Sequence, residues 1–259
     1  MSDEVLSERN GSLRIITLNR PDRHNAMDDA MSELFQRLLG DALEESESCA
    51  ILIRANGKSF CSGRDTNVLG HRARDESDFH FVRRHQEGRL RMQESTKPII
   101  AALKGGAIGG GCELALAADI RISDSTLKMA LPEINYGVLP DTGGTQMMTA
   151  LIGPSRTKYM VMSGERIDAP TALEWGAVDF VVEPEELDPG ALKIAQDIAA
   201  KPPLNLAMAK EMINLMHGAT IRTGTRAELY AQSYLFKTED YQEARAAIRE
   251  KRAPHYRGK

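Results

Sequence analysis

The fold of this chain is decided by Gly105-Gly106-Ala107-Ile108-Gly109-Gly110-Gly111-Cys112-Glu113. Five glycines in seven residues let the backbone turn sharply and come close to a ligand. We expect a helix over 111–118, whose first N–H groups have no acceptor within the helix and face whatever binds there. Glu113 lies one turn inside this helix. A backbone donor aimed at developing negative charge, beside a group that exchanges protons, is the minimum equipment for chemistry next to a carbonyl.

Strands and helices alternate on both sides of the glycine-rich stretch. Apolar runs predict strands at 13–19, 49–55, 98–103, 119–123, 127–131 and 178–182. Asn25 is expected to cap a helix whose apolar face includes Met31 and Phe35, and a polar helix is expected over 75–95. From about residue 203 onward every segment reads as helix. The pattern predicts an α/β core over residues 1–200 and a separate helical region over 201–259.

Composition excludes several classes of protein. The chain has 259 residues, enough to bury a full core, and a net charge of −4 does not favour nucleic acid or an anionic membrane. An odd number of cysteines, three, argues against a disulfide framework and for a reducing compartment. The first ten residues are polar and acidic, unlike a targeting peptide. We therefore expect a cytoplasmic enzyme with no membrane or nucleic-acid partner.

Three carboxylates are candidates for catalysis: Glu113, Glu133 and Asp141. The neighbours of Glu113 are almost wholly apolar, which predicts that it is buried. Burying a carboxylate costs free energy, so we expect Glu113 to have a functional role. Glu133 follows Leu131-Pro132, and two carboxylates in different surroundings can hold different protonation states. Taken alone, Glu133 reads as a solvated surface glutamate, the usual state for this residue. Asp141 or Thr142 could equally be the N-cap of a following helix.

Other polar patterns carry weaker signals. Gly63 permits a tight turn after which the Arg64 N–H could face a ligand, whereas Cys61 reads as a buried structural thiol. His80 and His85 are five residues apart, a poor spacing for metal ligands, so we expect both to be solvated and no metal site. A basic run reads as a solvated helix face or an RNA contact: Arg83, Arg84, Arg89 and Arg91.

Six motifs in order give the chain a clear resemblance. They are N-R-P-D-R-H-N-A-M at 19–27, S-F-C-S-G-R-D at 59–65, G-G-G-C-E-L-A at 109–115, L-P-E at 131–133, P-D-T-G-G-T-Q at 140–146, and F-K-T-E-D with E-K-R at 236–240 and 250–252. On these motifs the chain resembles the crotonase superfamily, or enoyl-CoA hydratase/isomerase family, over nearly its whole length. The resemblance implies a spiral of strand–strand–helix units, with C-terminal helices that assemble homotrimers or hexamers.

The resemblance also assigns roles to residues. The backbone N–H groups of Arg64 and Gly110 would bind the thioester oxygen of an acyl-CoA. Glu113 and Glu133 would hold one water, add its oxygen to the β-carbon and deliver a proton to the α-carbon. No metal or redox cofactor is required, since coenzyme A enters as part of the substrate. Contacts to coenzyme A are implied for Arg23, His24, Ser62, Arg64, Asp65 and, often from a neighbouring subunit, Lys251.

Asp141 departs from the hydratase pattern. Hydratases usually carry a small residue there, whereas an aspartate resembles certain isomerases, hydrolases and a dehalogenase of the family. The sequence therefore predicts hydration of 2-trans-enoyl-CoA thioesters to 3-hydroxyacyl-CoA, with an Asp141-dependent double-bond isomerase or acyl-CoA hydrolase as the alternative. A non-catalytic acyl-CoA or RNA binding protein is the further alternative. The acyl pocket is expected to be shaped by residues 67–92, which are unusually polar.

Overall fold

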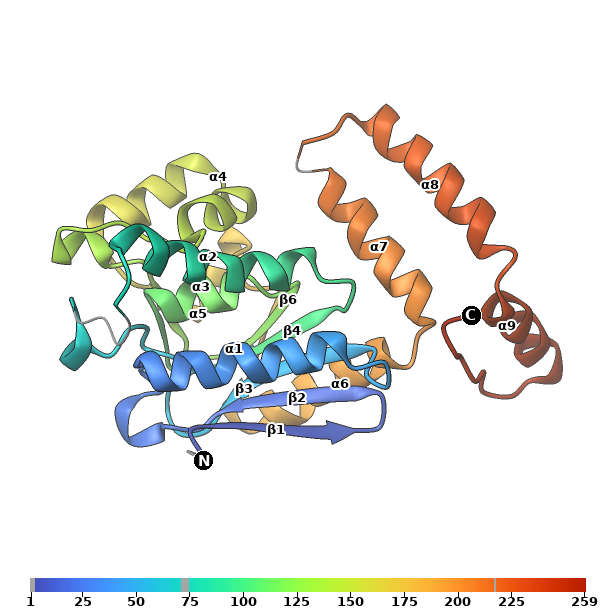
Figure 1. Ribbon diagram of the computed structural model, residues 1–259, viewed down its shortest axis with the longest axis horizontal. Helices are drawn as coiled ribbons and strands as arrows, with labels where there is room; N and C mark the ends of the chain where they lie inside the picture. The colour runs from blue at the N-terminus through green and yellow to red at the C-terminus, as the bar shows by residue number, and fades with distance from the viewer. Residues whose placement is uncertain (1–2, 71–74, 217) are drawn as a thin grey trace.

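The computed structural model describes residues 3–70, 75–216 and 218–259 (Figure 1). Its strands are β1 (Val5–Asn10), β2 (Leu13–Leu18), β3 (Ala50–Ala55), β4 (Ile99–Leu103), β5 (Gly106–Ile108), β6 (Ile120–Asp124), β7 (Lys128–Ala130), β8 (Ile167–Asp168) and β9 (Phe180–Val182). Its α-helices are α1 (Asp29–Glu44), α2 (Asp78–Glu94), α3 (Gly110–Leu116), α4 (Gly144–Ser163), α5 (Ala169–Trp175), α6 (Leu187–Ala199), α7 (Pro203–Leu215), α8 (Ile221–Leu235) and α9 (Glu239–Glu250). The part of 67–92 that spans residues 71–74 lies outside the described residues.

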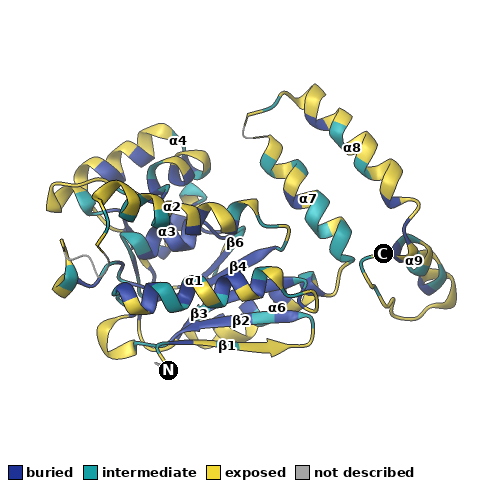
Figure 2. Ribbon diagram, in the orientation of Figure 1, coloured by how far each residue is buried: buried dark blue, intermediate teal, exposed yellow. Residues whose placement is uncertain are grey.

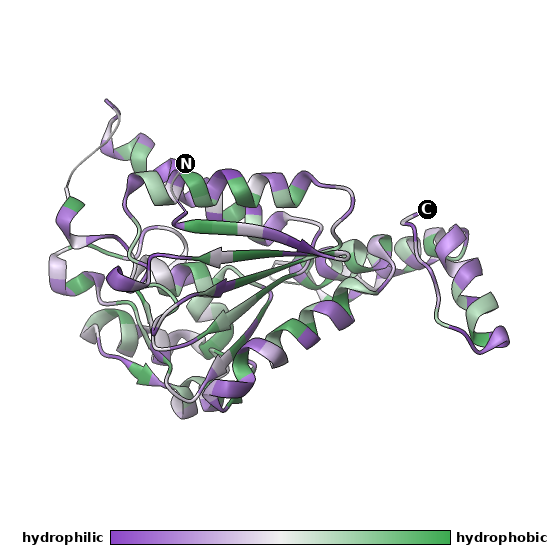
Figure 3. Ribbon diagram, turned by 90° about the horizontal axis from the view of Figure 1, so that it is seen from below, coloured by the Kyte–Doolittle hydropathy of each residue, from purple (hydrophilic) through white to green (hydrophobic). Residues whose placement is uncertain are grey.

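A six-stranded sheet in the order β1-β2-β3-β4-β6-β9 forms the centre of the molecule. All its pairings are parallel except β1–β2. Alternate residues of its strands enter two separate apolar clusters: in β3, Ile51 and Ile53 face one, while Ala50 and Leu52 face the other. Helix α6 covers the second face, and α1 and α3 cover the first. Burial on both faces explains why the strands read as continuous apolar runs (Figures 2 and 3).

A strand–strand–helix unit recurs along the chain. In β4–β5–α3 and again in β6–β7–α4, the first strand joins the six-stranded sheet and the second joins a three-stranded sheet ordered β5-β7-β8. After β3 the second strand is reduced to a single bridge between Cys61 and Ala107, and α2 follows. The second strands and the helix starts thus gather at one edge of the large sheet. The glycine-rich stretch lies at this edge.

Close backbone contacts explain the glycines at 105 and 111. A Cβ on Gly105, whose φ is 52°, would lie 1.9 Å from the Lys58 carbonyl oxygen. A Cβ on Gly111 would lie 2.1 Å from the carbonyl oxygen of Cys61. No side chain fits at either distance, so glycine is what allows β5 and α3 to pack against the segment that follows β3.

The C-terminal helices divide into two groups. Helix α7 is tied to the core by Lys210, whose Nζ lies 2.8 Å from Asp119 Oδ2, whereas α8 and α9 extend away from the body (Figure 1). In Figure 2 these two helices are largely exposed. The separation of 201–259 as an oligomerisation region stays a prediction. Across the described helices, none combines the length and apolar character that a membrane span requires.

The structure corrects two predictions about secondary structure. Asn25 does not cap α1, because Asp28 does, accepting a hydrogen bond from the Met31 N–H at 2.9 Å. Asn25 is instead fully buried at φ 55°, where its amide donates to the carbonyls of Asn56 and Ser59 at 3.0 and 2.8 Å. Asn tolerates this left-handed conformation. The sequence analysis also missed β1, β5 and β8, which are an exposed edge strand and two very short ones.

Candidate active site

Two backbone segments meet where the sequence predicted an oxyanion hole. Gly63 has φ 86°, and a Cβ there would lie 2.7 Å from the Ile108 carbonyl oxygen and 3.1 Å from the Gly110 nitrogen. The segment is fixed by hydrogen bonds from the Met27 N–H to Gly63 O at 2.8 Å and from the Asp65 N–H to Met27 O at 2.9 Å. Gly110 is the first residue of α3, and its N–H donates to none of the described residues. The segment that carries Arg64 therefore lies against the start of α3, where Gly110 is located.

The Arg64 side chain, which the sequence could not place, turns back onto the protein. Its Nη1 donates to Asp29 Oδ1 at 2.5 Å, and its Cζ lies 5.4 Å from the centre of the Phe81 ring. The buried thiol of Cys61 donates to the Asn25 carbonyl at 3.1 Å, and burial raises its pKa to about 11. It is a structural residue of this loop, as the sequence indicated.

Glu113 is buried, only 2% exposed, on the first turn of α3. Its Oε1 accepts hydrogen bonds from the N–H groups of Thr142 and Gly144 at 2.8 and 2.9 Å, at the start of α4. These donors and the positive end of the helix dipole stabilise negative charge on Glu113. Its Oε2 accepts no hydrogen bond from any described residue, so one oxygen is anchored and the other can contact a ligand.

Glu133 is in a contrasting environment. It begins a short 3-10 helix, Glu133–Tyr136, and its Oε2 is buried with no hydrogen-bond donor among the described residues. A Cβ on Gly109 would lie 2.9 Å from its Oε1, so the carboxyl group lies against the glycine-rich stretch. Burial, together with the charges of Glu113 and Asp141, raises the pKa of Glu133 to about 7. Glu133 is therefore protonated below about pH 7 and can act as an acid there.

Asp141 lies on the loop that joins Glu133 to α4, and its side chain is exposed. Its carbonyl oxygen accepts a hydrogen bond from Gln86 Nε2 of α2 at 2.8 Å. The sequence offered Asp141 or Thr142 as the N-cap of α4, and both are wrong: Gly143 occupies that position without a side-chain cap. The distant Glu113 takes over the capping of this helix.

Unsatisfied buried atoms mark this region as a ligand site. Four buried side-chain atoms of the described chain have no hydrogen-bond partner. They are Arg84 Nε, Arg89 Nε, Glu133 Oε2 and Thr142 Oγ1. Two belong to α2, and the other two belong to Glu133 itself and to Thr142, the residue after Asp141. Because buried polar atoms are otherwise almost always paired, their concentration here indicates a space that a polar ligand or water fills.

The residues implied in coenzyme A binding lie in different parts of the structure. Arg23 and His24 are exposed at a turn beside the Ser62 segment, where the Ser62 N–H donates to His24 O at 3.0 Å. Asp65 is 5% exposed and binds Arg20 at 2.9 Å, so its side chain supports the loop. Lys251, at the end of α9, belongs to the part of the chain that extends away from the body (Figure 1). Its contact with a neighbouring subunit's ligand stays a prediction.

The basic run of α2 is not a single solvated face, which corrects the sequence reading. Arg83 pairs with Glu87 and Arg84 with Glu76, at 2.9 and 2.6 Å. Arg89, by contrast, is buried and faces the site. His85 is also not solvated: its Nδ1 lies 2.8 Å from Phe81 O, and burial lowers its pKa. Helical spacing from the buried Met92 would have indicated this inner face.

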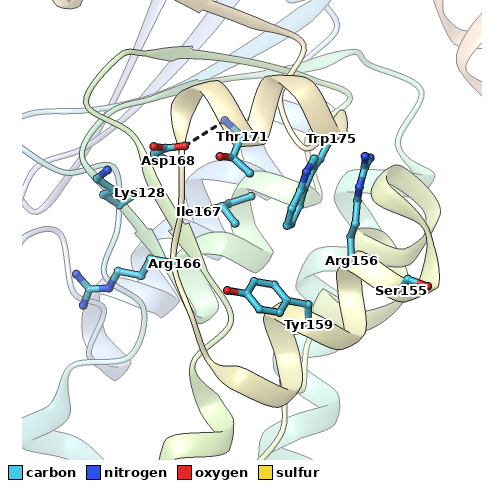
Figure 4. A pocket seen from close by; sticks show the side chains of 9 residues that line it. All are labelled: Lys128, Ser155, Arg156, Tyr159, Arg166, Ile167, Asp168, Thr171 and Trp175. Atoms are coloured by element: carbon cyan, nitrogen blue, oxygen red, sulfur yellow. Dashed lines mark hydrogen bonds between the residues drawn. The ribbon is translucent and has the colours of Figure 1, made fainter.

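A separate open cavity, about 760 Å³ in volume, lies between α4, β8 and α5 (Figure 4). Its walls include Tyr159 and Trp175, whose rings meet edge to face, and Arg156, whose Cζ lies 5.2 Å from the centre of the Trp175 ring. Its carboxylate, Asp168, accepts a hydrogen bond from the Thr171 N–H at 3.1 Å. None of the three candidate carboxylates lines this cavity, so it is not where they act. Within the described ranges, no cluster of His, Cys, Asp and Glu side chains could hold a metal ion.

Comparisons with known proteins relate the whole chain to one family of enzymes. A family model described as enoyl-CoA hydratase/isomerase matches residues 8–259. The short-chain-enoyl-CoA hydratase of Clostridium acetobutylicum is 34% identical over 252 residues, which cover 96% of this chain and 96% of the relative. Among solved structures, an enoyl-CoA hydratase from Bacillus anthracis is similar with a TM-score of 0.92 and 32% identity, over 99% of this chain and 100% of that one.

Proposed function

Since the chain belongs to the enoyl-CoA hydratase/isomerase family, we propose that it hydrates 2-trans-enoyl-CoA thioesters to 3-hydroxyacyl-CoA. The family and the fold likeness confirm the predicted crotonase-like α/β architecture. The reaction is proposed for this chain on the arrangement of Glu113, Glu133 and the two backbone segments. The observation that carries the proposal is the pairing of one anchored, charge-stabilised glutamate with one whose pKa is about 7.

In the proposed reaction, the thioester oxygen accepts hydrogen bonds from the N–H groups of Arg64 and Gly110. A water lies between the glutamates, and Glu113 Oε2 takes a proton from it as its oxygen bonds to the β-carbon. The electron pair of the double bond moves into an enolate, whose charge falls on the thioester oxygen. The two N–H groups and the dipole of α3 stabilise that charge. Glu133 then delivers its proton to the α-carbon, and the two glutamates return to their starting states by proton exchange with water.

The proposal calls for no metal ion or redox cofactor, because the thioester supplies the electron sink and coenzyme A is part of the substrate. We propose a cytoplasmic location, because an odd number of cysteines argues against a disulfide framework.

The pKa of Glu133 predicts how hydration depends on pH. Glu133 must hold a proton to deliver it, and its pKa of about 7 means that this form is lost as pH rises. We therefore expect kcat/KM for crotonyl-CoA to fall about tenfold per pH unit above about pH 7. A pH–rate profile measures this, and Glu133→Gln, assayed at its residual rate, should lack this descending limb. A wild-type profile that stays level up to about pH 9 would contradict the assignment of Glu133 as the acid.

An isomerase or hydrolase that uses Asp141 is the second candidate function. It is favoured by one observation: the charge of Asp141 contributes to the raised pKa of Glu133, so this aspartate belongs to the site. Its exposed side chain and the anchored Glu113 favour hydration. The non-catalytic acyl-CoA or RNA binding protein has less support, since a binding protein has no need for a buried acid–base pair.

We also propose that α8 and α9 assemble the chain into homotrimers or hexamers. Large apolar side chains are exposed on the C-terminal helices, among them Ile221 at 79%, Leu229 at 62% and Tyr230 at 71%. Unpaired apolar patches of this kind mark protein interfaces. Light scattering after size exclusion should give a mass of three or six chains, and Leu229→Glu should give a smaller species. A wild-type monomer at micromolar concentration would contradict this proposal.

A further inference from the structure

One buried cation in this structure lacks the partners that such groups require. Three cationic side chains are buried in the described chain: Arg89, Arg121 and Lys210. Arg121 donates to three carbonyl oxygens and pairs with Asp179 at 3.2 Å. Lys210 makes four hydrogen bonds, including the pair with Asp119 at 2.8 Å. Arg89 forms no ion pair with any described residue, and its Nε is buried without an acceptor.

The guanidinium of Arg89 lies beside the start of α3, where the proposed oxyanion hole is located. Its Nη2 has one long contact, 3.4 Å, to the carbonyl oxygen of Gly110, the residue whose N–H is proposed to bind the thioester. Gln86, one turn earlier on the same face of α2, donates to the Asp141 carbonyl at 2.8 Å. Arg89 is 9% exposed, so its guanidinium is turned into the protein and away from bulk solvent.

Burying an arginine without an ion-pair partner costs free energy. Removing an ion from water costs several kcal/mol unless an opposite charge and further hydrogen bonds replace its hydration. The charges of Glu113 and Asp141 act on Arg89 only from a distance, and burial lowers its pKa. Oε1 of Glu113 is already occupied by two backbone N–H groups. An apolar side chain could pack at this position of α2 without this cost. We therefore expect the ligand to supply the negatively charged partner of Arg89.

From these contacts we infer that Arg89 binds a carboxylate carried by the acyl chain, which makes the substrate a carboxylated enoyl-CoA. A guanidinium presents donors in a fork that matches a carboxylate and pairs with it through two parallel hydrogen bonds. A neutral acyl chain would leave Arg89 Nε without an acceptor. Arg64 and Arg84, whose guanidinium groups lie near the Phe81 ring, already pair with Asp29 and Glu76. The inference rests on the proposed function, because it names the substrate class of that same site.

Binding of saturated thioesters tests the inference without turnover. Calorimetry on the full chain compares glutaryl-CoA with pentanoyl-CoA and adipyl-CoA with hexanoyl-CoA, pairs that differ only in the terminal group. At the better-fitting length we expect the carboxylated ligand to bind about 10- to 100-fold more tightly. Arg89→Met should abolish the preference while retaining the unsubstituted ligand. Arg91→Met is the matched control on the same helix, since that side chain is 50% exposed, and it should change neither.

Two results would overturn the inference. One is equal binding of both members of each pair by the wild-type protein, a comparison that needs no variant to fold. The other is an equal loss of both ligands in Arg89→Met, which would make Arg89 a packing residue. The same experiments distinguish a failure of the hydratase proposal. If the protein does not hydrate enoyl-CoA but still prefers carboxylated ligands, the proposed reaction is wrong and the role of Arg89 stands. If the protein hydrates crotonyl-CoA but shows no preference for carboxylated ligands, the proposed role of Arg89 is wrong and the hydratase proposal stands.

Discussion

Glu113→Gln is expected to reduce hydration of an enoyl-CoA by about three powers of ten while leaving the fold intact. The amide oxygen of glutamine can take the place of Oε1 and accept the same hydrogen bonds from Thr142 and Gly144, so the start of α4 stays capped. The amide nitrogen then replaces Oε2. This group cannot accept a proton from water, and the attacking oxygen loses its base.

The decrease should appear in kcat, measured by loss of enoyl absorbance, with an unchanged melting temperature. Asp141→Asn is the matched comparison, because it also removes one carboxylate from the same site. We expect it to retain hydration within about tenfold of wild type, since its side chain is exposed and the proposed steps give it no role. The opposite pattern, with Asp141→Asn inactive and Glu113→Gln nearly normal, would replace the hydratase by the isomerase or hydrolase.

Gly110→Pro is the second variant with a large expected effect. A proline removes the N–H group outright, which no side-chain substitution does. The first position of a helix accepts proline well, and a Cβ on Gly110 would meet only Gly63 Cα at 3.9 Å. Loss of one oxyanion donor typically lowers kcat by about two to three powers of ten, and we expect a loss of this size here.

Gly110→Ala serves as the control for the proline variant, because alanine adds a side chain at the same place and keeps the N–H. It should retain most of the activity. Circular dichroism and melting temperature establish that both variants fold. Equal turnover in the proline and alanine variants would show that the Gly110 N–H does not hold the thioester oxygen.

Much of the fold could be predicted because its signals are local. Strands β3 and β4 are buried on both faces, so they are continuous apolar runs that any reading of the sequence finds. The glycines at 105 and 111 marked a close approach of backbones, although the segment they approach could not be known. Strand β1 has only Val5 buried and carries no such signal.

The site was less predictable because its properties depend on residues far apart in the chain. The cap of α4 comes from Glu113, about thirty residues earlier, so a local search offered Asp141 and Thr142 instead. The raised pKa of Glu133 depends on burial and on charges from two other segments. Arg89 was grouped with a basic run, since the run was considered as a unit and the inner face of α2, marked by Met92, was overlooked.

The product formed from crotonyl-CoA in D₂O tests the central claim most directly. If Glu113 and Glu133 add water across the double bond, mass spectrometry and proton NMR will show 3-hydroxybutyryl-CoA. Its β-carbon will carry the solvent oxygen, and its α-carbon will carry one deuteron that does not exchange. Release of free coenzyme A, a shifted double bond, or failure of the folded protein to hydrate both crotonyl-CoA and its carboxylated counterpart glutaconyl-CoA would contradict the account.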